Sequence, residues 1–405
     1  MEQQFAAPLV VLAQVNDRHG STIRGIDGHD VHERWRFETE RDHFVPITAL
    51  AADSGVVNAA TAEGLVYALS ASDGHLVWQH RVTGRHPDNR VPGALRVVAG
   101  GGVMAVNYMR PDLPPADTRH ITLLNGQDGS ELWVWHPPRY PLCVRLWNVA
   151  RRLNAQQRAG FVLLGIDSQG VYVTAASERH SPKSDRLRTI LLSRMSGNPQ
   201  WRTRQAAAAN YAGHWGSRTS VALANNTAYT VGQRLSALDT SNGRARWSRP
   251  IPSDEGVRPG PLVADESVLC AAYDSRFCAY RVRDGELLWQ LVSSREPVHV
   301  GSFLGMVLMD DAVYVSRSKY NPQSFGVEAH DALTGELRWE WPRPDASSES
   351  ASLARGDISW RLVGAGGILY VPGPTFLCAV RASDGELLWQ LPKAGGVPPL
   401  VAVAG

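Results

Sequence analysis

Short apolar runs alternate with polar turns along the whole chain, and one combination of the two recurs. An apolar run leads into a polar turn that ends in Gly, and a Trp follows four residues after that Gly. The seven clear copies are residues 68–78, 123–133, 191–201, 237–247, 279–289, 329–339 and 379–389. A degenerate eighth copy runs from Ile23 to Trp35 and has Val31 where the Gly is expected. Internal periodicity of this kind predicts a repeat architecture.

Each copy has the composition of a β-hairpin. The Asp-Gly, Asn-Gly and Thr-Gly pairs supply the positive φ that a tight turn between two strands needs. The Trp begins the second strand, and its ring is large enough to fill the gap between neighbouring sheets. Two more short strands precede each hairpin, for example residues 261–264 and 267–273 before the copy that ends at Trp289. Four strands per repeat predict an all-β protein, a β-propeller.

Eight Trp positions predict eight blades in a single domain over residues 1–405. Only three strands fit before residue 38, and one spare strand follows Trp389, so the C-terminal strand is expected to complete blade one. This closure removes the open edges of the sheet ring. Seven blades plus an N-terminal hairpin is the alternative. The predicted blades are residues 8–38 plus 398–404, 45–82, 93–136, 142–203, 217–250, 258–292, 297–342 and 357–392.

The repeat resembles the tryptophan-docking motif of the PQQ-like β-propeller superfamily, and the likeness covers nearly the whole chain. Asp331, Thr334 and Gly335 match the motif most closely, together with Asp239 and Thr240. The resemblance implies that one Trp per blade docks on the next blade. These residues are Trp35, Trp78, Trp133, Trp201, Trp247, Trp289, Trp339 and Trp389. In design the chain is nearest to the compact, non-catalytic outer-membrane assembly propeller of that superfamily, but it shows no signal peptide.

The predicted connections differ in length between the two faces of the ring. If A is the innermost strand and D the outermost, the A–B and C–D connections share one face. They are short, except for an expected long A–B loop at residues 151–160 of blade four. The long connections fall on the opposite face, at residues 84–92, 110–120, 136–141, 177–188, 202–217, 317–325 and 342–357. Loops on a rigid scaffold commonly carry binding sites, so we expect a partner on this face.

These loops are rich in Arg and aromatic residues, the types that dominate protein interfaces. The candidate partner-binding residues are Arg85, Arg110, Arg139, Tyr140, Arg179, Lys183, Arg186, Arg188, Tyr211, His214, Trp215, Arg218, Arg317 and Tyr320. A second candidate is an anion site in the central channel, because Arg96, Arg145 and Arg361 occupy equivalent places in predicted inner strands. Hydrogen bonds from each Arg to nearby carbonyl groups, or stacking of each Arg on a blade Trp, are the simpler explanation of these three positions.

Composition narrows the functional classes. The net charge is +2, and the long loops and their neighbours carry only about +6, so nucleic acid is not expected as a direct ligand. No apolar run is long enough to span a membrane. Without a basic N-terminal region or a lipid-anchor Cys, the chain is expected to be cytoplasmic. The four Cys residues are too few for a disulfide scaffold.

Three functions remain open. The first is a non-catalytic scaffold or regulatory subunit that binds a protein partner in a multi-subunit complex. The second is an oxidoreductase that uses PQQ with Ca²⁺, or another metal, at the channel mouth. No vicinal Cys pair and no acidic Ca²⁺ loop are present, so no cofactor and no metal site are expected. The third is a binder of a small ligand or glycan, with Trp147, Trp215 or Trp360 as a stacking platform.

Overall fold

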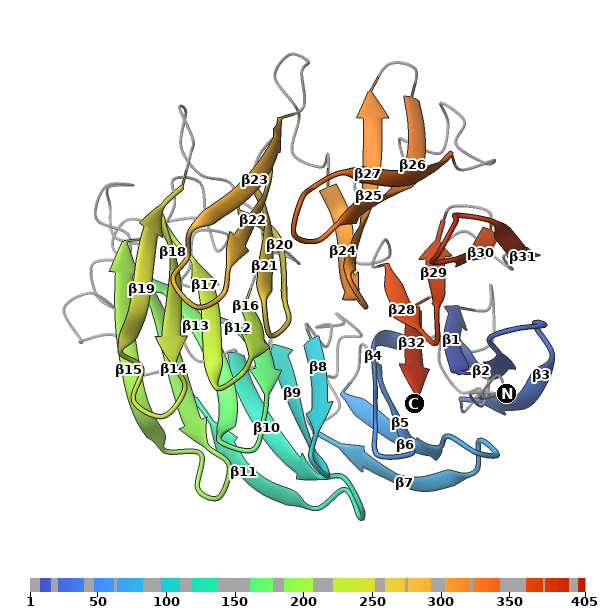
Figure 1. The fold of residues 1–405 in the computed structure, drawn as a ribbon. Coiled ribbons are helices and arrows are strands. Elements are labelled where there is room, and N and C mark those ends of the chain that lie inside the picture. Colours follow the sequence, from blue (N-terminus) through green and yellow to red (C-terminus); the bar gives the residue numbers. More distant parts are fainter. Residues whose placement is uncertain are drawn as a thin grey trace, which may run out of the picture.

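The fold is given by a computed structural model of the 405-residue chain. It describes residues 8–15, 21–39, 47–61, 64–82, 96–109, 119–136, 161–177, 186–206, 221–251, 259–273, 276–292, 303–320, 323–342, 362–373, 376–392 and 400–404. These residues form eight four-stranded antiparallel sheets that stand around a central axis (Figure 1). Among them no helix has the length and apolar character needed to cross a membrane. The prediction of an eight-bladed propeller is confirmed.

The strands of the first four blades follow one another outward from the axis. Blade one has β32 (Leu400–Ala404), β1 (Leu9–Val15), β2 (Ser21–Asp27) and β3 (Glu33–Glu38). Blade two has β4 (Ile47–Asp53), β5 (Val56–Thr61), β6 (Leu65–Ser70) and β7 (Leu76–Arg81). Blade three has β8 (Arg96–Gly100), β9 (Val103–Met109), β10 (Arg119–Asn125) and β11 (Glu131–Trp135). Blade four has β12 (Phe161–Ile166), β13 (Gly170–Ser177), β14 (Arg186–Ser193) and β15 (Pro199–Ala206).

The other four blades repeat this order. Blade five has β16 (Val221–Ala224), β17 (Thr227–Val231), β18 (Arg234–Asp239) and β19 (Ala245–Pro250). Blade six has β20 (Pro259–Ala264), β21 (Val268–Tyr273), β22 (Arg276–Arg281) and β23 (Leu287–Val292). Blade seven has β24 (Phe303–Met309), β25 (Ala312–Tyr320), β26 (Gln323–Asp331) and β27 (Leu337–Pro342). Blade eight has β28 (Val363–Ala365), β29 (Ile368–Pro372), β30 (Phe376–Arg381) and β31 (Leu387–Pro392).

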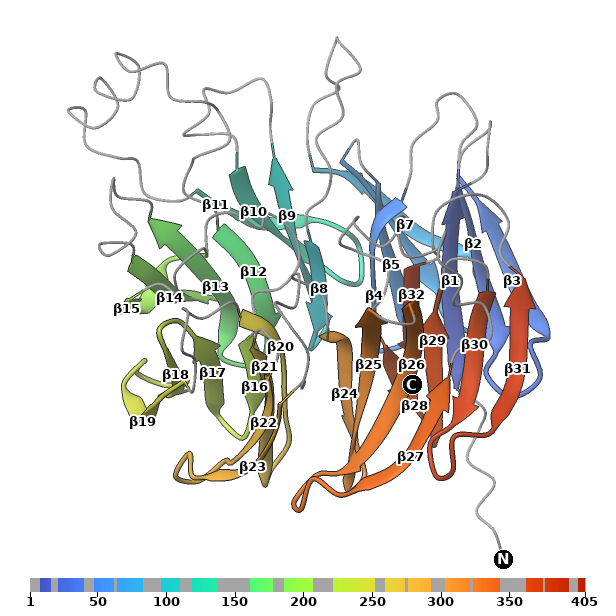
Figure 2. The same ribbon diagram turned by 90° about the horizontal axis from the view of Figure 1, so that it is seen from above.

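The ring closes through strands from opposite ends of the chain. β32 pairs antiparallel with β1, with Val10 opposite Val403 and Leu12 opposite Val401 (Figures 1 and 2). The innermost strands also contact one another around the axis, from β32 through β4 and β8 to β28 and back to β32. The predicted completion of blade one by the C-terminal strand is confirmed.

The apolar core lies in the seams between adjacent blades, and a Trp closes each seam. The indole Nε1 of each Trp donates a hydrogen bond to a carbonyl in the C–D turn of the next blade. The pairs are Trp35–Ala71, Trp78–Gly126, Trp133–Arg194, Trp201–Thr240, Trp247–Val282, Trp289–Ala332, Trp339–Ala382 and Trp389–Gly28, at 2.7–3.0 Å. The last pair joins blade eight to blade one, so the same contact runs around the whole ring.

One strand assignment in blade four was wrong. The predicted long A–B loop at residues 151–160 is not the A–B connection of this blade. β12 is the innermost strand, and it reaches β13 through a short turn at Asp167. The Asp167 carboxylate accepts hydrogen bonds from the Gln169 and Gly170 amides at 2.8 and 3.1 Å, which closes the turn. Asp265 makes the same kind of turn in blade six. The sequence Asp-Ser-Gln-Gly at residues 167–170 therefore forms a turn, which the prediction had included within one continuous strand.

Candidate binding surfaces

Blade four carries two long outer strands with arginines opposite each other. β14 and β15 each have eight residues, and β15 is the longest of the eight outermost strands. Arg188 of β14 lies directly opposite Arg204 of β15, and Ile190 lies opposite Arg202. Since side chains alternate along a strand, Arg202 and Arg204 lie on the side of β15 away from Trp201. Like charges directly across a strand pair are destabilising unless something neutralises them.

Nothing in the described part of the chain neutralises these arginines. Arg202 and Arg204 are exposed and Arg188 is half-buried, and no described side chain forms an ion pair with any of the three. The Arg188 Nε atom is buried and makes no hydrogen bond to the described residues. We call Arg188, Arg202 and Arg204 the arginine surface. Its uncompensated guanidinium groups are suited to carboxylate or phosphate oxygens.

In blade one, a carboxylate neutralises the Arg at the position equivalent to Arg202. Arg36 follows its docking Trp by one residue, as Arg202 follows Trp201. The Arg36 Nε and Nη2 atoms donate to the two Glu33 carboxylate oxygens at 2.9 and 3.1 Å. A bidentate pair of this kind uses the charge within the protein. No described residue forms such a pair with Arg188, Arg202 or Arg204.

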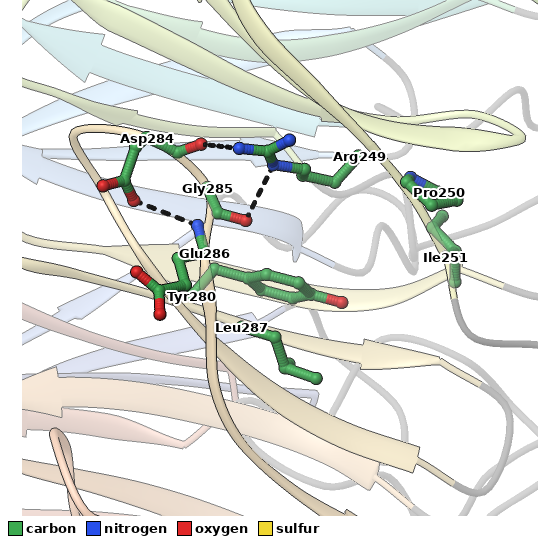
Figure 3. Close-up of a pocket in the computed structure, with 8 residues that line it drawn as sticks. All are labelled: Arg249, Pro250, Ile251, Tyr280, Asp284, Gly285, Glu286 and Leu287. Carbon is green, nitrogen blue, oxygen red and sulfur yellow. Dashed lines mark hydrogen bonds between the residues drawn. The ribbon is translucent and has the colours of Figure 1, made fainter.

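A second feature is a pocket of about 560 Å³ in the seam between blades five and six (Figure 3). Arg249 crosses from β19 to the next blade and donates from Nη2 to the Asp284 carbonyl at 2.8 Å and from Nε to the Gly285 carbonyl at 3.2 Å. The pocket is lined by Arg249, Pro250, Ile251, Tyr280, Asp284, Gly285, Glu286 and Leu287. At the repeat position of Arg249 the other blades have Phe37, His80, Trp135, Thr203, Leu291, Trp341 and Leu391.

The polar groups of this pocket are largely engaged with the protein itself. The Asp284 carboxylate accepts the Glu286 amide at 3.0 Å, and Glu286 also pairs with Arg281. Tyr280 is buried, and this burial raises the pKa of its hydroxyl. The pocket therefore offers mainly an apolar surface and a defined shape.

Several described ionisable groups have pKa values shifted in the direction that keeps their ordinary charge state. The pKa of Asp239 is lowered to about 2 by hydrogen bonds from Ser241 and by Arg246. Hydrogen bonds from Arg338 lower the pKa of Asp331 to about 2 as well. Burial raises the pKa of the Cys278 thiol to about 11. At neutral pH these carboxyl groups are ionised and this thiol is protonated, which suits structural roles better than acid–base or nucleophilic chemistry.

The structure places only part of the predicted site. Arg188 belongs to the arginine surface, while Arg186 lies in β14 and Arg317 and Tyr320 lie in β25. The remaining predicted partner residues lie outside the described part of the chain: Arg85, Arg110, Arg139, Tyr140, Arg179, Lys183, Tyr211, His214, Trp215 and Arg218. Sequence reasoning missed Arg202 and Arg204, although the alternation Trp-Arg-Thr-Arg on an outer strand was visible.

The predicted channel site changes as well. Arg96 is the first residue of β8, an innermost strand, as expected. Arg145 and Arg361 lie outside the described residues. Because β12 fills the innermost place in blade four, the assignment of the segment around Arg145 to that place was wrong. The proposed equivalence of Arg96 and Arg145 loses its basis.

The described residues offer few groups for a metal or cofactor. They bring no three His, Cys, Asp or Glu side chains together in a way that would hold a metal ion. Cys270 and Cys278 are buried free thiols that pack in different seams, so the described residues place no disulfide between them. The Trp147, Trp215 and Trp360 candidates for ligand stacking lie outside the described residues.

Eight blades of this kind, each locked by a Trp, define a PQQ-like β-propeller. The family model for outer membrane protein assembly factor BamB matches residues 15–170 and 187–405, so the chain belongs to that family. Tetrathionate hydrolase of Acidithiobacillus ferrooxidans is 22% identical over 384 residues, which is 87% of this chain and 68% of that protein.

Solved structures share the fold at low sequence identity. BamB from Moraxella catarrhalis has a TM-score of 0.54 and 16% identity, with 97% of this chain and 91% of that chain covered. AztD from Citrobacter koseri has a TM-score of 0.61 and 12% identity, with 99% of both chains covered. The relatives thus include an assembly factor and a protein named as a hydrolase, and fold alone does not separate these functions.

Proposed function

We propose that this protein is a non-catalytic scaffold or regulatory subunit that binds a protein partner within a larger assembly. The arginine surface carries the proposal, because Arg188, Arg202 and Arg204 have no counter-charge among the described residues. Arginine is the cation best suited to interfaces, since its planar group binds carboxylates in two places. Membership of a family described as an assembly factor supports the same function.

The charge states of the described groups favour binding over catalysis. Each described Asp or Glu whose pKa departs from its ordinary value is shifted downward, as at Asp239 and Asp331. A general acid would need a carboxyl pKa raised toward neutrality. The described carboxylates instead hold turns and Arg side chains in place.

The test is purification of the tagged chain from its native host at moderate salt, followed by mass spectrometry. We expect one protein partner in stoichiometric amount. The triple substitution of Arg179, Arg186 and Arg188 by Ala should remove it without lowering the melting temperature. A control replaces Arg244, Arg283 and Arg381, which lie in or beside C–D turns on the opposite face of the ring, the turn face. These substitutions remove the same charge. The control should keep the partner; purification of the chain alone would count against a scaffold.

An enzyme is the second candidate, and the likeness to a tetrathionate hydrolase is the observation that favours it. It predicts that the purified chain consumes tetrathionate, or oxidises an alcohol after addition of PQQ and Ca²⁺. Turnover in either assay, with no partner in the purification, would establish the enzyme and remove the scaffold. A cytoplasmic location is part of the scaffold proposal, and fractionation of the host cells tests it directly.

A further inference from the structure

The outer edge of blade four differs from other outer edges of the ring. An outermost strand is a sheet edge, and proteins commonly guard such edges with charges or Pro. The third residue after the docking Trp is Pro250 in blade five, Pro342 in blade seven and Pro392 in blade eight. Pro has no amide hydrogen, so it blocks pairing at that place. Blade four has Arg204 there and keeps the amide, as blades one, two, three and six also do. Blade four differs from all of these in having Arg at both the first and the third position after its docking Trp, at Arg202 and Arg204.

The charges on β15 select which strand can pair with this edge. Arg202 and Arg204 are two residues apart, so their Cα atoms are separated by roughly 7 Å along the strand. A second copy of β15 would place arginines against arginines, which disfavours self-pairing. A strand with Asp or Glu at alternate positions would instead place a carboxylate opposite each of them.

We propose that the edge of β15 binds an extended segment of the partner protein with acidic side chains at alternate positions. The segment adds a fifth strand to blade four by main-chain hydrogen bonds. Its carboxylates pair with Arg202 and Arg204, and Arg188 on the neighbouring strand adds to the positive charge. This inference rests on the proposed scaffold function and names the kind of segment that the scaffold binds.

A labelled synthetic peptide tests the edge without a partner. The probe is acetyl-Thr-Glu-Thr-Glu-Thr-Glu-amide, and fluorescence anisotropy measures its Kd for the full chain. A control peptide with the same composition, Glu-Glu-Thr-Thr-Glu-Thr, keeps the charge but has no two Glu residues two positions apart. We expect the alternating peptide to bind about tenfold more tightly, since it can form two cross-strand ion pairs at once.

Two further measurements separate strand pairing from simple charge attraction. N-methylation of alternate peptide amides blocks main-chain hydrogen bonds and should weaken binding about tenfold or more. The double variant R202E/R204E should weaken it to a similar degree, whereas R244E/R283E on the turn face makes the same charge change and should not. The melting temperature of each variant checks that it is folded.

Three results would overturn the inference. Equal Kd values for the alternating and control peptides, or for the methylated and unmethylated ones, would show a charged surface without strand pairing. Polyuridylate that binds more tightly than the peptide and competes with it would identify a nucleic-acid surface instead. If the host partner is captured but R202E/R204E retains it, the scaffold stands and the edge site fails. If the peptide binds as expected but no partner is captured, the scaffold function fails instead.

Discussion

In all eight seams of the ring a Trp docks on a turn of the next blade. The turn residue at positive φ is Gly in seven seams and Val31 in the seam that closes the ring. In a regular seam such as that between blades four and five, Gly243 has a φ of +70°, and its amide donates to the Asp239 carbonyl at 2.8 Å. A Cβ atom at Gly243 would stand 2.5 Å from Cε3 of Trp201. The Trp ring therefore rests on a backbone that has no side chain.

The closing seam between blades eight and one has Val31 at that place. Its φ is +66°, a conformation that is rare and strained for a β-branched residue. The Val31 amide donates to Asp27 at 3.2 Å, compared with 2.8–2.9 Å for the seven Gly turns. The Trp389 indole still donates to the Gly28 carbonyl at 2.8 Å. The indole hydrogen bond is thus common to all eight seams, whereas the close packing of the Trp ring on a Gly occurs only in the seven regular seams.

The largest expected effect is loss of a docking ring from a regular seam. Trp247 is 9% exposed, and W247A removes its hydrogen bond to Val282 and leaves a cavity in the apolar cluster between blades five and six. We expect the free energy of unfolding to fall by about 3–5 kcal/mol, measured by urea denaturation. W389A in the closing seam should cost less than W247A, because Trp389 is only partly buried, as Trp289 and Trp339 are in two regular seams. Equal losses would mean that the two kinds of seam are energetically alike.

The sequence was sufficient for the fold because the signal is physical and repeated. A Gly at positive φ, a Trp four residues later and an apolar run before them each have a structural cause, and seven copies agree. Even the degenerate copy was recognised with Val31 at the Gly position, and the structure shows Val31 in the same backbone conformation. The count of strands at the two ends then led to the pairing of β32 with β1.

The binding surfaces were harder to predict because they depend on contacts between segments. That Arg188 lies opposite another arginine, with no counter-charge among the described residues, can be recognised only when β14 and β15 are paired in register. The pocket beside Arg249 depends on a contact with the turn of the next blade, 35 residues away along the chain. In blade four, the apolar pattern alone did not predict which strand is innermost, because that assignment depends on recognising the turn at Asp167.

A smaller effect is expected when the closing-seam residue is placed in a regular seam. G243V adds a β-branched side chain at positive φ and pushes it against Trp201, so we expect a loss of about 2–4 kcal/mol. G55V is the matched control, because Gly55 has a φ of +76° and a Cβ there would meet nothing within 4 Å. It carries the backbone strain alone and should cost less than G243V. Equal losses of unfolding free energy in urea denaturation would mean that backbone strain causes the whole effect and that the contact with Trp201 contributes nothing.

The smallest effect is expected from the reverse change, V31G. The substitution relieves the strain at φ +66°, which stabilises the folded protein. It also removes a side chain that packs on the same apolar cluster as Trp389, and it gives the unfolded chain the extra freedom of Gly. Because these contributions are of similar size and opposite sign, we expect the free energy of unfolding to change by less than about 1 kcal/mol. Urea denaturation of V31G beside G243V measures the asymmetry directly. A loss from V31G as large as that from G243V would show that the closing seam depends on its Val as strictly as the other seams depend on their Gly.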